Sequence, residues 1–309
     1  MKKLVKITAV ILAAVLMLTS FAFSCFAENY ETPFENSSFY LEGDYSIHYR
    51  VFPNSGDKKG NIMFIHGFGL STSSFDDMIE LFTKEGYYCV SVDLPNMGYS
   101  TRENEKTRII DRETLIYNLM TSLLDEKWIL AGHSLGGGVS VNIACDHPEK
   151  IERLLLFAPQ TVEQSGGYNS RLSGSALMRF LFNFVIKYGT RSRLLMKIVM
   201  YAAMQDNAYA SQYDVELIRQ PLQIENTGAG LAVMAANARC VDYEKVKVLD
   251  IPALIIRGDK DNIASADNIE RLENALGNVN EETVSGAGHM LIYTKAAEVF
   301  GLSNNFLNK

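Results

Sequence analysis

The alternation of short apolar runs with segments of helical period is the feature that most constrains the fold. Runs rich in apolar, often β-branched residues are separated by helix-like segments such as 73–84 and 112–124. Strands of this kind are buried on both faces, so the pattern predicts an α/β fold: a mostly parallel central sheet with helices on both faces. The expected strands are 61–65, 87–92, 128–131, 151–157, 253–256 and 282–284, with extended segments within 39–51 before them.

The alternation stops between Pro159 and Ile251, where helix-like patterns continue without strong strands. We therefore expect 28–159 and 251–309 to form the α/β core and 160–250 to form an inserted helical cap. Residues 171–204 carry six basic residues, no acidic residue and many apolar ones. Two interpretations fit: packed helices with a basic outer face, or a lid with an apolar inner wall and a cationic face towards a membrane or an anionic substrate.

The first 27 residues differ from the rest of the chain. Three lysines precede an uncharged apolar stretch, 7–23, and small residues follow up to Ala27. This is the pattern of a secretory signal peptide, with cleavage expected after Ala27 or, alternatively, after Ser24. The apolar run from Ile7 to Ala27 is also long enough to stay as an N-terminal membrane anchor. We expect a secreted or extracytoplasmic protein, with membrane anchoring as the alternative.

Charge and cysteine content exclude several classes. The formal net charge is −7, so the chain as a whole lacks a basic footprint for nucleic acid. Four cysteines in 309 residues do not form a disulfide scaffold. Cys89 and Cys145 are expected to be buried thiols, and pairing of Cys240 with either stays open. No Cys/His spacing is typical of a metal site, so neither a metal nor another cofactor is expected. The sequence does not indicate an oligomeric state.

The segment Gly132-His133-Ser134-Leu135-Gly136 follows a predicted strand and opens a helix. Small neighbours let a serine occupy a strained strand-to-helix turn, which pushes its hydroxyl out at the carboxyl end of the sheet. The helix N-terminus beneath it presents backbone N–H groups to developing negative charge. Ser134 is therefore the candidate nucleophile.

A second glycine-rich turn, His66-Gly67-Phe68-Gly69, follows the strand 61–65. Its glycines let the backbone approach a substrate oxygen closely. The N–H groups of Phe68 and Leu135 are therefore the candidate oxyanion hole. His66 belongs to the strand end and is expected to be structural.

A serine nucleophile needs a nearby base. His289, in Gly286-Ala287-Gly288-His289, lies after the last predicted strand and before the helix-like segment 294–300. The other four histidines lie in a strand-like region, at a strand end, in the turn of Ser134 and at a helix end, which leaves His289 as the candidate base. A carboxylate would orient it, and two aspartates, Asp259 and Asp261, follow the strand 253–256.

These four segments, in this order, resemble the α/β-hydrolase superfamily, in its members with a serine nucleophile. The resemblance covers about residues 37–305, and the order Ser134, Asp261, His289 is that of the family. Residues 251–261 are similar to its P-x-L-x-I-x-G-x-x-D segment, whose last aspartate, here Asp261, is the acid. Residues 93–100 look like its D-x-P-G-x-G-x-S segment, with Asn96 where glycine is usual. Asparagine tolerates the left-handed backbone of such a turn.

The resemblance implies a covalent mechanism without a cofactor. Ser134 would attack a carbonyl carbon, His289 would move the proton, and Asp261 would orient the imidazole. Phe68 and Leu135 would hold the oxyanion through their N–H groups. A serine in place of an aspartate argues against dehalogenases and epoxide hydrolases. The apolar cap favours a small-molecule ester or acyl substrate, so a carboxylic-ester hydrolase is expected.

Two alternatives remain at this point, because one fold hosts many reactions. An aminopeptidase-type peptidase would need acids that hold a free amine, for which the inserted segment offers Glu163, Asp206, Asp214 and Glu216. The alternative of another class is a ligand-binding or sensor protein that retains the triad but turns over slowly.

Overall fold

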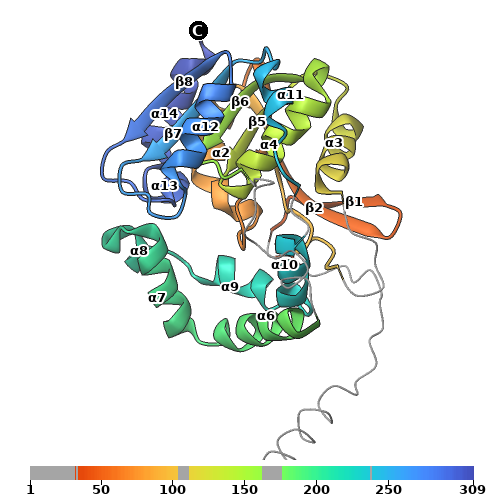
Figure 1. Cartoon of the computed structure of the whole chain (residues 1–309), viewed down its shortest axis with the longest axis vertical. Coiled ribbons are helices and arrows are strands. Elements are labelled where there is room, and N and C mark those ends of the chain that lie inside the picture. Colours follow the sequence, from red (N-terminus) through yellow and green to blue (C-terminus); the bar gives the residue numbers. More distant parts are fainter. Residues whose placement is uncertain (1–31, 33, 104–110, 162–175, 237–238) are drawn as a thin grey trace, which may run out of the picture. The chain divides into compact units, whose positions relative to one another are not determined.

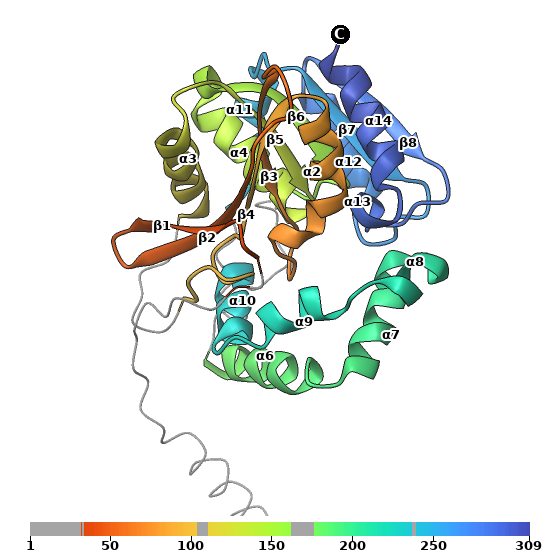
Figure 2. The same ribbon diagram turned by 180° about the vertical axis from the view of Figure 1, so that it is seen from behind.

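In the computed structural model, an eight-stranded sheet forms the centre of a compact unit, Glu31–Lys309 (Figures 1 and 2). The structure describes residues 32, 34–103, 111–161, 176–236 and 239–309, so the predicted signal segment 1–27 lies outside it. The strand order is β1-β2-β4-β3-β5-β6-β7-β8. The strands are β1 (Ser37–Glu42), β2 (Tyr45–Phe52), β3 (Gly60–Ile65), β4 (Tyr87–Val92), β5 (Trp128–His133), β6 (Ile151–Phe157), β7 (Ala253–Gly258) and β8 (Val279–Val284).

The predicted, mostly parallel sheet is confirmed. Six neighbouring strands of the sheet, β4, β3, β5, β6, β7 and β8, run parallel. The strand β2 pairs antiparallel with β4, and β1 pairs antiparallel with β2 at the edge of the sheet. The last residues of β3 and β5 are neighbours, since Ile65 pairs with Gly132. At the other side, Gly258 of β7 pairs with Val284 of β8. The loops that follow these four strands therefore leave the sheet at one edge, where ligands bind in folds of this kind.

Helices cover both faces of the sheet, and β3 shows how each face is filled. Ile62 and Phe64 belong to one hydrophobic cluster, with residues of α2 and α14, while Met63 and Ile65 belong to the other, with residues of α3, α4 and α12. All four side chains are fully buried. The helices that accompany the sheet in the described residues are η1 (Thr72–Phe75), α2 (Asp76–Lys84), α3 (Arg112–Leu123), α4 (Leu135–Asp146), η2 (Pro148–Lys150), α12 (Ala266–Ala275), α13 (Leu291–Thr294) and α14 (Ala296–Leu307).

Two elements differ from the prediction. The last strand, β8, begins at Val279 rather than at residue 282. The apolar pattern missed its first residues because the middle of the strand is exposed and polar. The helix α12 was not predicted, although Ile269 and Leu272 are buried on one of its sides. The cysteine question is also answered: Cys89, Cys145 and Cys240 are free thiols, so Cys240 pairs with neither of the others.

Between β6 and β7 the described residues contain helices and no strand. The helices are α6 (Ala176–Gly189), α7 (Arg193–Met204), α8 (Asn207–Gln212), α9 (Glu216–Leu222), α10 (Thr227–Ala236) and α11 (Tyr243–Lys247). Neither interpretation of 171–204 includes what the structure shows here: ten large apolar side chains of α6 and α7 are exposed, beside exposed basic ones, while the methionines of α7 are buried. A cap function for these inserted helices stays a prediction. No helix in the described residues is both long and apolar enough to cross a bilayer.

A buried arginine fastens the inserted helices to the sheet domain. Arg102 donates hydrogen bonds to the carbonyl oxygens of Met97 (3.0 Å) and Gly98 (2.6 Å) in the turn after β4. The same guanidinium donates to the Pro221 carbonyl of α9 (3.1 Å) and to the Thr227 hydroxyl of α10 (2.8 Å). Because a planar guanidinium offers its donors in fixed directions, this one side chain sets the position of α9 and α10 against the turn.

The same turn contains Asn96, which adopts the left-handed backbone expected for the family's glycine position (φ 72°). Its side-chain oxygen accepts a hydrogen bond from the Glu103 N–H (2.6 Å), and its amide donates to the Glu103 carboxylate (2.6 Å). A Cβ on Gly230 of α10 would lie 2.3 Å from the Asn96 oxygen. The asparagine therefore keeps the turn and also forms part of the contact with α10.

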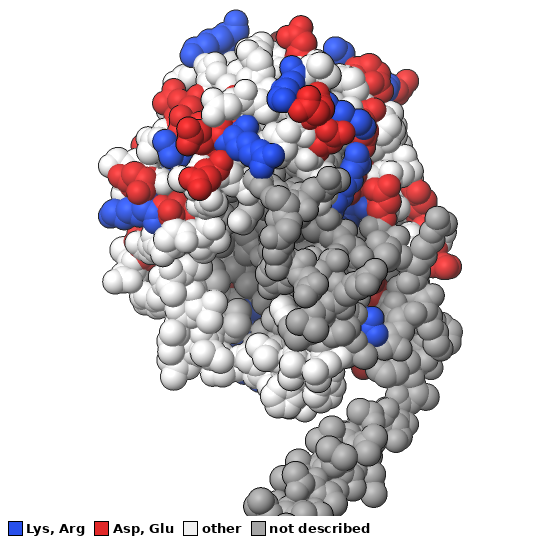
Figure 3. All heavy atoms as spheres, in the orientation of Figure 1, with Lys and Arg blue, Asp and Glu red and all other residues white. Residues whose placement is uncertain are grey.

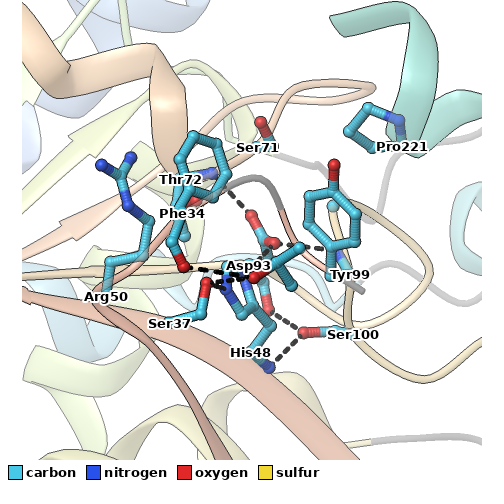
Figure 4. A network of polar contacts seen from close by, with 12 residues as sticks. Phe34, Ser37, His48, Arg50, Ser71, Thr72, Asp93, Tyr99, Ser100 and Pro221 are labelled. Carbon is cyan, nitrogen blue, oxygen red and sulfur yellow. Dashed lines mark hydrogen bonds and ion pairs between the residues drawn. The ribbon is translucent and has the colours of Figure 1, made fainter. Parts of the chain in front are cut away.

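The carboxylate of Asp93, directly after β4, joins three parts of the sheet domain (Figure 4). One oxygen accepts from the Thr72 N–H of η1 (2.6 Å). The other oxygen accepts from His48 Nδ1 of β2 (2.6 Å) and from the Tyr99 N–H (2.8 Å). Asp93 and His48 are both fully buried. Since η1 ends the loop that carries Phe68, Asp93 fixes one end of the candidate oxyanion loop.

We predict that Asp93→Asn lowers the free energy of unfolding by about 3 kcal/mol, because an amide cannot accept from all three donors and one is left unsatisfied in the interior. Urea unfolding at neutral pH measures the change. The exposed Asp250 provides the control: Asp250→Asn should stay within about 0.5 kcal/mol of the wild type. Equal stability of the two variants would contradict the structural role of the Asp93 carboxylate.

Candidate active site

Ser134 lies between β5 and α4 with a backbone conformation that residues with side chains avoid (φ 53°, ψ −119°). Its N–H donates to the Phe157 carbonyl of β6 (3.0 Å), and its carbonyl accepts from the N–H groups of Gly137 and Gln160 (both 2.9 Å). The turn closes only because Gly132 and Gly136 lack side chains: a Cβ on Gly132 would lie 2.4 Å from the Gly136 carbonyl oxygen. The strained turn predicted from the sequence is therefore present.

Three predicted side chains form one hydrogen-bonded chain. The Oγ of Ser134 lies 2.9 Å from Nε2 of His289, and Nδ1 of His289 lies 2.9 Å from a carboxylate oxygen of Asp261. An ionised Asp261 only accepts, so Nδ1 carries the proton and Nε2 is free to accept the serine proton. Ser134 is 6% and His289 5% exposed, which keeps bulk water away from the proton path.

Of the two aspartates after β7, only Asp261 contacts His289. Its second oxygen accepts from the N–H groups of Ile263 (2.8 Å) and Ala264 (3.0 Å), which fixes the carboxylate. Burial alone would raise the pKa of Asp261, but the hydrogen bond and charge of His289 and these two N–H groups outweigh it and hold the pKa below its usual value. Asp259 is exposed and accepts from the Gly286 N–H (2.7 Å), as expected for a solvated turn.

The two candidate oxyanion donors lie on loops that contact the serine turn closely. A Cβ on Gly67 would lie 3.1 Å from the Cβ of Ser134, and a Cβ on Gly136 would lie 2.0 Å from the Ile65 carbonyl oxygen. Leu135 is the first residue of α4, whose leading N–H groups have no partner within the helix. In the described residues, neither the Phe68 nor the Leu135 N–H donates a hydrogen bond. Both are therefore available to an oxygen bound at Ser134.

The structure gives His133 a contact that sequence reasoning missed. His133 is fully buried, and its Nε2 donates to the carbonyl oxygen of His289 (2.9 Å). The histidine beside the nucleophile thus holds the loop of the candidate base, and no sequence signal pairs the two positions. His66, in contrast, is structural as predicted: Nδ1 donates to the Gly67 carbonyl (2.7 Å), and Nε2 accepts from the Leu94 N–H (3.0 Å).

The described residues contain no group of three or more His, Cys, Asp or Glu side chains placed to hold a metal ion. A family model described as the alpha/beta hydrolase fold matches residues 60–296, which is most of the chain.

The chain belongs to the α/β-hydrolase family.

Curated relatives of this α/β-hydrolase include an uncharacterised hydrolase, YugF, of Bacillus subtilis, which is 24% identical over 80% of this chain and 88% of the relative. A putative esterase/lipase of Haemophilus influenzae is also 24% identical, over 80% of this chain and 83% of the relative. Among solved structures, the enol-lactonase from Burkholderia xenovorans has a TM-score of 0.70 at 16% identity, covering 88% of this chain and 100% of that chain. The structural likeness supports the fold.

This α/β-hydrolase contains a second Ser-His-Asp array, formed by Ser37, His48 and Asp93 (Figure 4). Ser37 Oγ lies 2.8 Å from His48 Nε2, and His48 Nδ1 lies 2.6 Å from Asp93. Ser37 belongs to the edge strand β1, and no helix N-terminus follows it. The rings of Phe34, Phe39 and Tyr99 surround His48. The array ties the β1–β2 hairpin to Asp93, directly after β4.

The four acids named for binding a free amine are engaged elsewhere or lie outside the described residues, as Glu163 does. Asp206 caps α8 through the Tyr209 N–H (3.0 Å), and Asp214 accepts from the Glu216 N–H (3.0 Å). Glu216 pairs with Arg193 (2.8 Å) and with Arg219. Glu216 is therefore held in ion pairs, while Asp206 and Asp214 each use one oxygen for a backbone N–H group.

We predict that lowering the pH from 7 to 5 destabilises the protein. Burial lowers the pKa of His133 to about 3, whereas an unfolded histidine titrates near 6.5. Between these values the unfolded state binds the extra proton, so stability falls as the pH falls, by about 2 kcal/mol from His133 alone. Burial also lowers the pKa of His66, which adds a loss of the same sign.

Urea unfolding at pH 7, 6 and 5 measures this loss. The lowered pKa values of Asp93 and Asp261 keep their contributions intact until the pH falls below their unfolded values near 4. Burial raises the pKa of Asp76 and of Glu273, which acts in the opposite sense, so the measured change is the loss from the histidines less this gain. A free energy of unfolding that stays constant or rises on acidification would contradict the prediction.

Proposed function

We propose that this α/β-hydrolase is a serine hydrolase of carboxylic esters, acting through Ser134, His289 and Asp261. The observation that carries the proposal is the continuous hydrogen-bonded chain from the Ser134 hydroxyl to the Asp261 carboxylate, placed at the N-terminus of α4. A nucleophile, its base and the group that orients the base are the three parts that acyl transfer needs.

In the proposed reaction, His289 Nε2 takes the Ser134 proton as Oγ attacks the ester carbonyl carbon. The carbonyl oxygen becomes an oxyanion, which the N–H groups of Phe68 and Leu135 stabilise. Asp261 stabilises the imidazolium through Nδ1. His289 then gives the proton to the leaving alkoxide, the C–O bond breaks, and an acyl-enzyme forms. Water attacks the acyl-enzyme with His289 as the base, which releases the acid and restores Ser134.

Two observations support an ester with an apolar acyl or alcohol group. The inner side of α7 presents Met196, Met200 and Met204, which share a hydrophobic cluster with Met290, the residue after the proposed base. Methionine side chains adapt to ligands of varied shape. Relatives with esterase or lipase names agree with this substrate class. Of the acids that an aminopeptidase could use, Glu216 is held in ion pairs with Arg193 and Arg219, and we favour the ester over the peptide bond.

We also propose that 1–27 directs export and is cleaved after Ala27, with retention as a membrane anchor as the alternative. The mass of the mature protein from its host distinguishes the two, because an intact Met1 would refute cleavage.

We predict that residues 28–309 hydrolyse nitrophenyl esters in a series from acetate to palmitate. Ser134→Ala should lower kcat by about 10⁴-fold or more, because the nucleophile is lost while the fold remains. The matched control is Ser37→Ala, which removes the serine of the second array and should keep at least about half of the activity. Full activity in Ser134→Ala, or an equal loss in Ser37→Ala, would refute the assignment.

If the wild type turns over no ester, aminoacyl-nitroanilides test the peptidase. A single slow acylation of Ser134, seen as a mass increase that persists, would indicate a sensor instead.

The two aspartates after β7 allow a second test. Asp261→Asn should lower kcat by about 10³–10⁴-fold with little change in KM, because an amide at this place favours the wrong histidine tautomer. Asp259→Asn changes a carboxylate of the same type, two residues away, that does not contact His289. It should leave kcat within about twofold. The ratio of the two kcat values decides between Asp261 and Asp259 as the orienting acid.

A further inference from the structure

The helices α6 and α7 each have one side that is already packed. In α7, Met196, Met200 and Met204 recur every fourth residue and are buried in the cluster of the sheet domain. In α6, the backbone around Asn183 abuts α10, where a Cβ on Gly228 would lie 2.4 Å from the Asn183 Cα. These contacts hold both helices in place without their outer sides.

The outer sides of the two helices are nonetheless apolar. Ten of the fourteen large apolar side chains that are exposed in the described part of the chain lie here, each between 42% and 71% exposed. Such side chains are usually scattered singly on the surface of a soluble protein, and a concentration of them marks an interaction site. We call them the α6–α7 face: Leu177, Phe180, Leu181, Phe184, Val185, Tyr188, Leu194, Leu195, Ile198 and Val199.

The face continues from one helix to the other. Phe180 stacks on Phe184 (6.5 Å between ring centroids), and Phe184 contacts Tyr188 (4.6 Å) near the end of α6. The Leu195 side chain of α7 lies beside Gly189, the last residue of α6. Figure 3 shows red and blue side chains crowded over the sheet domain and mostly white ones at the lower left and bottom, in the region of α7 and α6 that grey atoms do not cover.

The charges on this face have one sign. Lys187, Arg191 and Lys197 are exposed between the apolar side chains, and residues 176–204 contain no aspartate or glutamate. The chain as a whole has the opposite balance, with a net charge of −7. An apolar helix face interspersed with lysine and arginine is typical of helices that lie in the interface of a membrane with anionic lipids. The long basic side chains can reach the headgroups while the apolar ones enter the acyl region.

We propose that the α6–α7 face docks on an anionic lipid surface. The charges favour lipid over a second copy of this chain, because a symmetric dimer through this face would bring one set of exposed cations, Lys187, Arg191 and Lys197, towards the same set of the other copy. Docking would not require hydrolysis and stands independently of the proposed function.

A consequence for catalysis does rest on the proposed function. The helix α7 ends at Gln205, which has a left-handed backbone (φ 54°). A Cβ on Gly288 would lie 2.8 Å from the Gln205 side-chain oxygen, so this cap of α7 touches the loop of His289. The helix that enters the lipid surface therefore ends beside the proposed base, which would place the reacting group within reach of an ester drawn from the bilayer.

Cosedimentation with vesicles of phosphatidylcholine, with and without phosphatidylglycerol, tests the docking. The protein used is the chain from Glu28, because Glu31–Lys309 is a compact unit that contains both hydrophobic clusters. The expected result is at least about tenfold stronger binding to the anionic vesicles, weakened by salt. Equal or absent binding to both kinds of vesicle would overturn the proposal.

Three variants locate the binding surface. Phe184→Ser/Leu194→Ser/Ile198→Ser should lower vesicle binding about tenfold or more, because it removes apolar side chains from the face. Lys187→Gln/Lys197→Gln should remove most of the preference for anionic lipid. The control, Leu41→Ser/Val248→Ser, removes two exposed apolar side chains elsewhere, at 68% and 81% exposure, and should bind like the wild type.

Thermal unfolding checks that each variant is folded, whatever its activity. Loss of binding in the control to the same extent as in the triple variant would overturn the assignment to this face. Concentration-dependent dimerisation that the triple variant abolishes, without vesicle binding by the wild type, would show that the face pairs with a second copy instead. Vesicle binding without ester turnover would leave the docking intact and refute only the proposed function.

Discussion

The backbone of Ser134 is the constraint on which the rest of the site depends. A residue with a side chain at φ 53° and ψ −119° costs about 1–3 kcal/mol, and the surroundings must hold it there. They do so from three directions: β6 accepts its N–H, and Gly137 and Gln160 donate to its carbonyl. The small residues around it let α4 approach the end of β3 within backbone contact distance. The same close approach brings the Phe68 loop beside the serine, so one strained residue places the candidate nucleophile next to the candidate oxyanion donors.

The two Ser-His-Asp arrays show that residue identity and spacing do not define such a site. Their hydrogen-bond distances are nearly the same, yet Ser37 sits in an edge strand and Ser134 on a strained turn before a helix. Ser134 precedes a helix whose leading N–H groups have no partner within the helix, whereas Ser37 lies within a strand. The buried His48–Asp93 pair holds the hairpin and the start of η1 instead. The surrounding backbone therefore decides which array can stabilise a developing negative charge.

Most of the sheet can be predicted from the sequence because its parallel strands contain apolar runs that are buried on both faces, as 128–131 and 253–256 are. The strand β8 is an edge with an exposed, polar middle, so only its end is apolar enough to predict. The serine turn is local and therefore readable, whereas the hydrogen bond from His133 to the His289 carbonyl joins positions that only the folded sheet brings together. The outward apolar side chains of α6 and α7 were misassigned for a related reason. The hydrophobic periodicity of a sequence shows that a helix has an apolar and a polar side, but not which side faces the rest of the protein.

Among the inserted helices, α7 packs against the sheet domain with one side and exposes apolar side chains on the other. Arg102 and Gly230 fix α9 and α10 to the turn after β4, so the insertion is anchored through the two helices that follow α8. Near the proposed base, α7 contributes methionines inward and Gln205 at its end, while its outer side exposes leucine, isoleucine and valine. Exposed apolar area of this extent costs solubility and adds no folding stability, so folding alone does not account for it. Intermittent coverage of this area by another surface would account for it. The proposed partner, a membrane with anionic lipid, matches both the apolar character of the α6–α7 face and the sign of its charge.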